Sequence, residues 1–348
     1  MRTRGRDTHQ LDLFGPHDGE GPHARLAPRQ PSHSAVAPAG LDPAQAALGR
    51  RLHPTIRLGT SSWSFSGWNG LVYGGEYTST TLARRGLEAY ARHPLLRAVG
   101  IDRTYSAALP AAQFAVYATA VPDGFRFLVK APEACTLARF PRHGRYGAVA
   151  GQLNRTFLDA AYAADAIVGP MVEGLGPKAG PLVFQFPPQA TTAVGTPGTF
   201  ADRVHRFLSG LPRGPLYAIE IRNAELLTPD YAAALAANRA CHCLTVHPTM
   251  PDLGQQAAVT RLETGPAVVV RWMLQPGLRY EAARARYAPF NKLVDEDPAT
   301  RQAIAALCRR QAARGAETFV IANNKAEGSA PLTVFRLAAA IVDPECAA

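Results

Sequence analysis

Two opposite charges interrupt an otherwise apolar segment in the middle of the chain, Leu216-Tyr-Ala-Ile-Glu-Ile-Arg-Asn223. Side chains alternate along a β-strand, so Glu220 and Arg222 share one face while the apolar side chains share the other. Buried charges are costly unless they are paired, and a positioned carboxylate can act as a general acid or base. The segment therefore predicts either a catalytic pair, with Arg222 setting the pKa of Glu220, or an ion pair that closes a packed interior.

The same kind of segment recurs at regular intervals along the chain. The predicted strands cover residues 56–61, 98–104, 125–131, 181–186, 216–222, 242–247, 267–272 and 317–323. The predicted helices between and after them cover residues 79–93, 111–120, 146–168, 200–209, 229–238, 298–314 and 331–342, and residues 250–263 fit either a short helix or a loop. Strict alternation of strand and helix predicts an α/β fold, a closed (β/α)8 TIM-type barrel over residues 53–345.

An open, doubly wound sheet is the alternative architecture for this alternation. That fold binds dinucleotides through a Gly-x-Gly-x-x-Gly turn after its first strand, and no such turn follows residues 56–61. The closed barrel is therefore favoured, and no nucleotide cofactor is expected.

In a closed barrel, the residues that follow the strands gather at one mouth, where the catalytic groups of this fold lie. Polar or aromatic residues stand at or just after every predicted strand end, namely Trp63, Asp102, Lys130, Gln185, Glu220, Arg222, His247, Arg271, Asn323 and Asn324. Lys130, Arg222 and Arg271 supply cations, and arginine suits bidentate recognition of phosphate or carboxylate. The mouth is therefore predicted to bind an anionic ligand, with Trp63 stacking on a base or sugar.

A phosphate could also bind where Gly328 and Ser329 precede the last predicted helix. Helix N-termini after the last two strands of such barrels bind phosphate through free N–H groups. Ser329 as a simple helix cap and Gly328 as a turn residue explain the same pattern equally well. The basic and aromatic residues of segment 275–297 could similarly follow a nucleic-acid backbone, although an ordinary amphipathic helix is favoured there.

Metal-ligating residues are sparse at the predicted mouth. Only Asp102, Glu220 and His247 qualify clearly, which is too few for a three-zinc cluster. One divalent ion on Asp102 and Glu220 remains an alternative. We expect no other metal site.

The overall composition restricts the class of protein only weakly. The chain of 348 residues has a formal net charge of +10, but only four of its 37 basic residues are lysine, so the basicity is weak evidence of a polyanionic partner. Its five cysteines have no repeating spacing, which indicates a reduced, cytoplasmic protein. Neither a long apolar run nor a signal-like start is present, so no membrane association is expected.

Residues 1–52 lack a sustained apolar period and are predicted to be a disordered tail. One apolar patch interrupts this tail, Gln10-Leu11-Asp12-Leu13-Phe14. It resembles the sliding-clamp-binding motif of bacterial replication and repair proteins, in which the glutamine fills a polar subsite and the Leu-Phe pair a hydrophobic pocket. The resemblance implies a bacterial sliding clamp as a partner, contacted by Gln10, Leu11, Leu13 and Phe14; a stray apolar patch is the alternative.

Several ordered motifs of the barrel resemble those of the YecE-like family, known as domain of unknown function 72. They are Gly59-Thr-Ser-Ser-Trp63-Ser-Phe-Ser-Gly-Trp68, Phe125-Arg-Phe-Leu-Val-Lys130-Ala-Pro132, Gly180-Pro-Leu-Val-Phe-Gln185-Phe-Pro-Pro188, Glu220-Ile-Arg222 and Asn323-Asn324. The resemblance implies a TIM-type barrel, distantly similar to those of endonuclease IV and xylose isomerase, with no established chemistry. Family histidines are replaced here, for example by Asn223 and Trp272, and Lys325 follows the Asn-Asn pair.

Two functional hypotheses follow. In the first, the barrel is a hydrolase or lyase acting on a phosphate-bearing substrate such as damaged DNA: Glu220 is the general acid or base, Lys130 and Arg271 stabilise negative charge, and Asp102 assists. The second is a non-catalytic accessory protein with the same pocket. An enzyme acting on a small phosphorylated or carboxylated, sugar-like metabolite is a variant of the first. The clamp-like motif favours a nucleic-acid ligand, because tethering raises local concentration at DNA.

Overall fold

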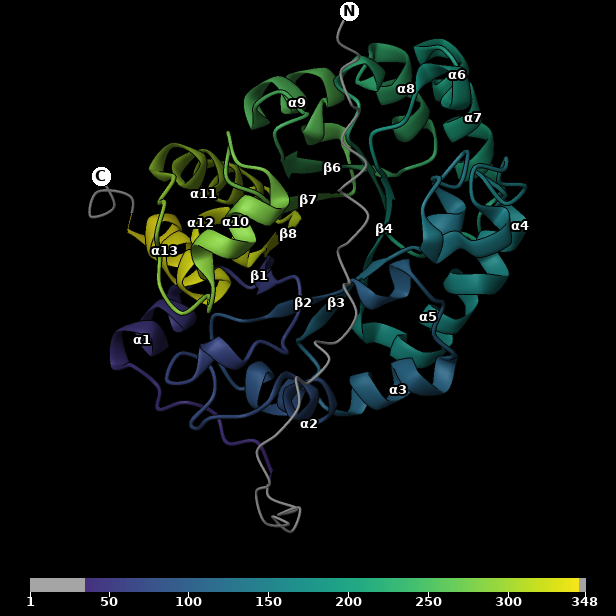
Figure 1. Ribbon diagram of the computed structural model, residues 1–348. Coiled ribbons are helices and arrows are strands. Elements are labelled where there is room, and N and C mark those ends of the chain that lie inside the picture. Colours follow the sequence, from purple (N-terminus) through teal and green to yellow (C-terminus); the bar gives the residue numbers. More distant parts are fainter. Residues whose placement is uncertain (1–34, 344–348) are drawn as a thin grey trace, which may run out of the picture.

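The computed structural model describes residues 35–343, which form a closed barrel of eight parallel strands (Figure 1). The strands are β1 (Ile56–Thr60), β2 (Ala98–Ile101), β3 (Arg126–Lys130), β4 (Ala179–Phe186), β5 (Tyr217–Ile221), β6 (Cys241–Val246), β7 (Ala267–Trp272) and β8 (Glu317–Ala322). Each strand pairs with its neighbour in the chain, and β8 pairs with β1. The predicted (β/α)8 barrel and all eight predicted strands are confirmed.

The helices form a ring outside the strands (Figure 1). Their bounds are α1 (Pro43–Arg51), α2 (Ser79–Ala91), α3 (Ala111–Thr119), α4 (Ala160–Ala163), α5 (Gly169–Leu175), α6 (Thr191–Val194), α7 (Pro197–Gly210), α8 (Pro229–Ala237), α9 (Leu253–Thr260), α10 (Tyr280–Tyr287), α11 (Pro298–Ala312), α12 (Asn324–Glu327) and α13 (Ala330–Val342). Capping side chains start many of them. Thr78 caps α2, Thr196 caps α7 and Asp297 caps α11.

Two sequence predictions about helices are wrong. Of the single helix expected over residues 146–168, only the last part is helical, as α4 followed by a π-helix at Ala164–Val168; a 3-10 helix at Gly144–Val149 and an irregular segment take the place of the rest. Gly147 and Gly151 have positive φ, which interrupts a helix. Disorder was expected through residue 52, yet α1 is helical and packs on α13 through the Arg51–Asp343 ion pair.

The alternation of side chains along each strand separates two cores. One face packs outward on the helices, and the other forms a small apolar layer inside the barrel, including Ala98, Leu128, Val183, Ala218, Cys243, Val269 and Phe319. Further along the strands, on the same inner face, lie the positions nearest the mouth, for example Lys130, Gln185, Glu220 and Arg271. The inner face is therefore apolar in its lower part and polar at the carboxyl end.

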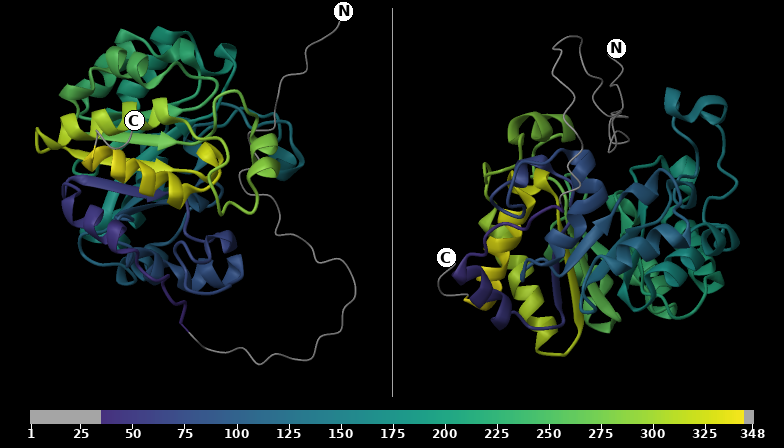
Figure 2. Two further views of the ribbon diagram at one scale, coloured as in Figure 1. Left: turned by 90° about the vertical axis from the view of Figure 1, so that its left-hand side faces the viewer. Right: turned by 90° about the horizontal axis from the view of Figure 1, so that it is seen from below.

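Two long connections stand above the mouth. One follows β3 and carries the 3-10 helix Gly144–Val149, and the other follows β7 and carries α10. Strands β3 and β7 lie on opposite sides of the barrel, and Figure 2 shows both connections projecting from the same end of the molecule. The mouth therefore opens between them. Among residues 35–343, no helix has the length and apolar character needed to cross a bilayer.

Candidate functional site

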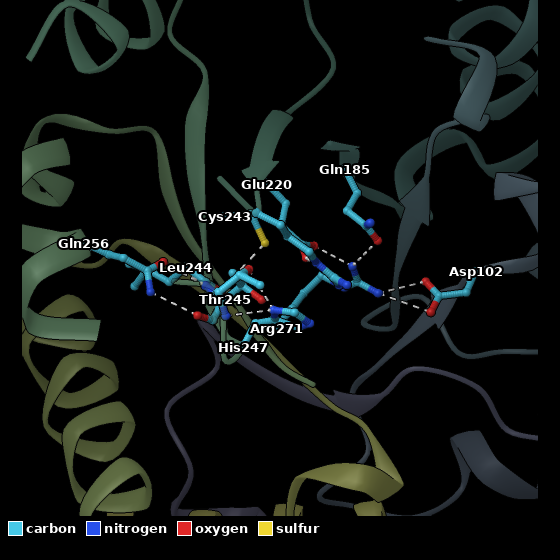
Figure 3. A network of polar contacts seen from close by, with 11 residues as sticks. Asp102, Gln185, Glu220, Cys243, Leu244, Thr245, His247, Gln256 and Arg271 are labelled. Atoms are coloured by element: carbon cyan, nitrogen blue, oxygen red, sulfur yellow. Dashed lines mark hydrogen bonds and ion pairs between the residues drawn. The ribbon is translucent and has the colours of Figure 1, made fainter. Parts of the chain in front are cut away.

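Strand register places several predicted site residues in one layer at the mouth. Gln185 of β4 is the direct neighbour of Glu220 of β5, and Arg271 of β7 lies opposite Thr245 of β6. All of these side chains are at most 2 % exposed. The close-up in Figure 3 shows Arg271 reaching toward Glu220, Gln185 and Asp102. The expected convergence of polar side chains at the mouth is therefore present.

Glu220 is enclosed between two arginines. Its Oε1 accepts a hydrogen bond from Arg222 Nε at 2.8 Å, and its Oε2 accepts one from Arg271 Nη1 at 2.5 Å. Burial alone would raise the pKa of Glu220, but the guanidinium groups of Arg271 and Arg222 outweigh it and hold the pKa well below its usual range. Glu220 stays ionised at any physiological pH. The prediction that it acts as a general acid or base does not fit this geometry, in which the carboxylate holds the two arginines in place.

Arg271 joins three strands of the mouth. Besides Glu220, its Nη1 contacts Gln185 Oε1 at 3.4 Å, and its Nη2 donates to both oxygens of Asp102 at 3.2 Å. Burial would lower its pKa, but the two carboxylates raise it above the ordinary value, so the charge is permanent. Its Nε is buried and makes no hydrogen bond to the described residues.

The two carboxylates do not fit a metal site. Asp102 is bound by Arg271, and Glu220 by Arg271 and Arg222, so their oxygens already face cationic donors. No group of three or more His, Cys, Asp or Glu side chains within residues 35–343 is arranged to hold a metal ion. A divalent ion on Asp102 and Glu220 would have to displace these guanidinium groups and repel them.

Lys130 occupies the end of β3 on the inner face of the barrel. Its side chain is 0 % exposed, and Nζ has no hydrogen-bond partner among the described residues. The ring of Tyr105 lies against it, with its centroid 3.6 Å from Nζ. Burial, reinforced by Arg271 and Arg222 against the attraction of Asp102, lowers the pKa of Lys130 to about 7. A large fraction of the amine is therefore neutral at physiological pH.

Lys325 is a second mouth lysine, which the sequence reasoning noted only as a departure from the family pattern. It lies in α12 after β8, is 7 % exposed, and has its Nζ 4.4 Å from the ring centroid of Tyr280 of α10. Burial, against the attraction of Asp102, lowers its pKa to about 8. The unusual position of a lysine after the Asn-Asn pair was the signal that could have identified it.

The connection after β3 adds three residues that the sequence reasoning missed. Glu133 accepts hydrogen bonds from Arg145 Nη2 at 2.5 Å and from Tyr146 Oη at 3.0 Å. Burial, against the attraction of Arg145, raises the pKa of Glu133. Proximity in sequence to Lys130 was the only available signal, because Arg145 and Tyr146 reach the site through an irregular loop.

His247 lies at the end of β6 and is partly buried at the mouth. Its Nδ1 is 2.9 Å from Thr249 Oγ1. Burial, together with Arg222, lowers the pKa of His247 to about 3, so the ring is neutral at physiological pH. A neutral imidazole can accept or donate a hydrogen bond to a ligand but adds no positive charge.

Several predicted ligand-binding residues are instead structural. Trp63 is buried, donates from Nε1 to the Leu82 carbonyl at 3.1 Å and packs edge-on against Tyr117, so it cannot stack on a ligand at the mouth. Asn323 donates to Ser61 Oγ at 2.8 Å and caps α12. Asn324 Oδ1 accepts from Trp68 Nε1 at 3.3 Å and from the Ala330 N–H at 2.8 Å.

The predicted phosphate-binding site before α13 has no space for a phosphate. Gly328 and Ser329 are fully buried, and the first N–H of the helix, from Ala330, is already bound by Asn324. Gly328 has φ of +119°, and a Cβ there would lie 2.6 Å from the Lys292 carbonyl oxygen. These residues form a tight turn against the connection after β7, which fits the structural alternative and leaves no room for a phosphate.

The predicted partner-binding residues Gln10, Leu11, Leu13 and Phe14 lie outside the described part of the chain. Within that part, Cys135, Cys241, Cys243 and Cys308 are buried and unpaired. Their thiols are consistent with packing residues, since burial raises the pKa of Cys135 to about 12.

Comparisons with known proteins agree with the fold. A DUF72 family protein from Enterococcus faecalis is 18 % identical, with a TM-score of 0.53 over 83 % of this chain and 95 % of that one. A DUF72 family protein from Thermotoga maritima is 17 % identical, with a TM-score of 0.55 over 81 % and 97 %. No curated protein matches the sequence. The model of the family described as "Protein of unknown function DUF72" matches residues 57–345, and the chain therefore belongs to the DUF72 family.

Proposed function

We propose that the mouth of the barrel binds an anionic, phosphate-bearing ligand. The observation that carries the proposal is a pair of buried cationic donor atoms, Lys130 Nζ and Arg271 Nε, which have no hydrogen-bond partner among the described residues. A buried, unsatisfied donor costs about 1–3 kcal/mol, and more when it is charged. An anion bound between the two long connections would satisfy both donors.

The charge balance of the mouth supports the same ligand class. Lys130, Arg222, Arg271 and Lys325 supply positive charge against the carboxylates Asp102 and Glu220. Glu220 neutralises part of the arginine charge but leaves a positive surplus. A phosphate or carboxylate group in a site this buried interacts more strongly with such cations than it would in water.

A hydrolase or lyase acting on the bound phosphate-bearing substrate is the reaction class that fits these residues. Lys130 and Arg271 would stabilise developing negative charge, as the sequence suggested. Proton transfer would fall to Lys130 rather than to Glu220, because a lysine with a pKa of about 7 can both take up and release a proton near neutral pH. A non-catalytic accessory protein with the same pocket is the alternative.

Calorimetric titration of the full chain with inorganic phosphate and pyrophosphate tests the anion proposal. Lys325→Met removes one cation without breaking an ion pair and is expected to weaken binding roughly 10–100-fold, the equivalent of one charged hydrogen bond of ~1.5–3 kcal/mol. Lys292→Met removes an exposed lysine and should leave the affinity unchanged. Absence of saturable binding by the wild type, or equal weakening in both variants, would refute the proposal.

We further propose that the N-terminal motif at residues 10–14 binds the bacterial sliding clamp. All five positions match that motif, and its place in a polar, Pro- and Gly-containing tail suits docking of a short apolar segment. A clamp tether would concentrate the barrel at replicating DNA, in the cytoplasm, and make damaged DNA the natural phosphate-bearing ligand.

Titration of purified sliding clamp with the full chain tests the tether. The Leu13→Ala/Phe14→Ala double variant should abolish saturable binding, whereas Leu26→Ala, elsewhere in the tail, should bind as the wild type does. Undiminished binding by the double variant would remove the motif from the proposal, and the search for a ligand would then turn to small phosphorylated or carboxylated metabolites.

A further inference from the structure

We propose that Lys130 is a nucleophilic amine that forms an imine with an aldehyde or ketone group carried by the anionic ligand. This inference rests on the proposed function, because the arginines that surround Lys130 would bind the phosphate or carboxylate of that ligand. It goes further by naming the reactive group of the substrate and the covalent bond.

The surroundings of Lys130 differ from those of a structural lysine. Lys178, for comparison, is a lysine whose Nζ donates to the Ala118 and Val121 carbonyls at 2.8 and 2.7 Å. Lys130 Nζ is buried in the same chain, yet it has neither a carbonyl nor a carboxylate as a hydrogen-bond partner in the described part of the protein. A lysine that stabilised the fold through hydrogen bonds would show such partners.

Two kinds of group surround Lys130 Nζ. The face of the Tyr105 ring, with its centroid 3.6 Å from Nζ, offers an apolar wall. The charges that act on Nζ are those of Asp102, Arg271 and Arg222, and both arginines are held by Glu220. An anionic group attached to a carbonyl carbon next to the amine would therefore lie within the field of two guanidinium groups.

The protonation state supports nucleophilic attack, since only the neutral amine has the lone pair that attacks a carbonyl carbon. Burial and the nearby arginines lower the pKa of Lys130 to about 7, so the neutral amine is populated near neutral pH. The cation–π contact with Tyr105 favours the ammonium form by ~0.5–2 kcal/mol and opposes this effect only in part.

The bond changes balance without a further oxidant or reductant. The lone pair of Nζ forms a bond to the carbonyl carbon, and one amine proton moves to the carbonyl oxygen, which gives a carbinolamine. The hydroxyl group takes up a proton from solvent and leaves as water, and the nitrogen lone pair forms the C=N bond of a protonated imine. The positive charge of the imine can then draw electrons from the neighbouring carbon, which is the usual purpose of such a lysine.

Two sources could supply an anionic carbonyl compound of this kind. One is a small phosphorylated aldehyde or ketone, and the other is the ring-opened deoxyribose of an abasic site in DNA, which carries an aldehyde between two phosphates. Both share the chemistry that the site recognises. In both cases the ligand must displace the Tyr105 ring or part of the connection after β3, because Lys130 has no exposed surface.

Reductive trapping tests the inference on the full-length wild-type protein. Glyceraldehyde 3-phosphate in one arm, and a DNA oligonucleotide with one abasic site in the other, are incubated with the protein and sodium cyanoborohydride, which reduces an imine to a stable secondary amine. The chain has only four lysines, Lys130, Lys178, Lys292 and Lys325, so peptide mass spectrometry assigns the adduct. We expect the adduct on Lys130, and the arm that gives it identifies the source.

Matched variants separate the possible outcomes. Lys130→Met should lose the adduct at least 10-fold, whereas Lys292→Met should keep it. Trapping by the wild type should fall as the pH drops below about 7, following the pKa of Lys130. An adduct on Lys325, or no adduct in either arm while inorganic phosphate still binds saturably, would overturn the imine and leave the anion site intact. Loss of phosphate binding itself would instead refute the proposed function.

Discussion

Replacing Lys130 by methionine should make the protein more stable, although it removes a proposed functional residue. Methionine has a similar length and flexibility but no charge, so it can fill the same space. The lysine has no hydrogen bond to lose, since its Nζ is unsatisfied among the described residues. The change therefore removes a desolvation cost that outweighs the lost cation–π contact with Tyr105 and the lost attraction of Asp102, as expected of a group retained for function rather than for stability.

The magnitude follows from the pKa of Lys130, which falls from 10.5 to about 7 on folding. At ~1.4 kcal/mol per pH unit, this fall corresponds to about 5 kcal/mol. Below pH 7 the amine is protonated in both the folded and the unfolded chain, so the full cost is present. Between pH 7 and 10.5 only the unfolded chain holds the proton, and the cost shrinks as the pH rises. The gain in Lys130→Met should therefore be larger at pH 6 than at pH 9, by about 3 kcal/mol.

Urea denaturation of both proteins between pH 6 and pH 9 measures this difference. Lys178→Met is the control, because Lys178 Nζ donates to two backbone carbonyls; its loss should destabilise the protein by ~1–3 kcal/mol. A Lys130→Met variant that is less stable than the wild type at every pH would refute the reasoning. A gain that does not change with pH would refute its electrostatic part.

Three further predictions concern the supports of the site. Glu220→Gln should destabilise the protein by ~3–5 kcal/mol in thermal denaturation, because Arg222 loses its carboxylate partner and Arg271 keeps only Asp102. The pKa of Glu220 lies below its ordinary value of 4.5, so its contribution is present above that pH and lost as the pH falls; acid unfolding should be less steep in this variant. Asn324→Ala should cost ~1–2 kcal/mol with unchanged phosphate affinity in calorimetry. Gly328→Ala should lower the melting temperature, because its φ of +119° and the Lys292 carbonyl at 2.6 Å exclude a Cβ.

The sequence correctly predicted the barrel and which side chains of its strands point inward. The inner-face residues of β5, Ala218 and Glu220, could be assigned from alternation alone, and the apolar layer below the mouth confirms it. The prediction of side-chain direction was less accurate for residues that follow a strand end by one or two positions. Trp63, Asn323 and Asn324 follow their strands as expected but turn into the wall of the barrel, where neighbouring loops supply their partners.

Predictions from local composition were also wrong for a segment whose structure depends on contacts with distant parts of the chain. The polar composition of the tail suggested disorder to residue 52, but α1 is ordered by Arg51 pairing with Asp343 at the other end of the chain. Arg97 further stabilises α1 by donating hydrogen bonds to the carbonyls of Gly49 and Leu52. No window of sequence around residues 43–51 contains these partners.

The amino-acid sequence by itself determined the eightfold alternation, the closed barrel and the set of charged residues at its mouth, because these depend on periodicity within each segment. Only the tertiary structure decided what each charge does. Arg271 is 169 residues from Asp102, yet their pairing, together with Glu220, fixes the arginine in place. Burial and pairing are set by neighbours in space, and they made Glu220 a permanent anion while leaving Lys130 a buried amine with a pKa near neutrality.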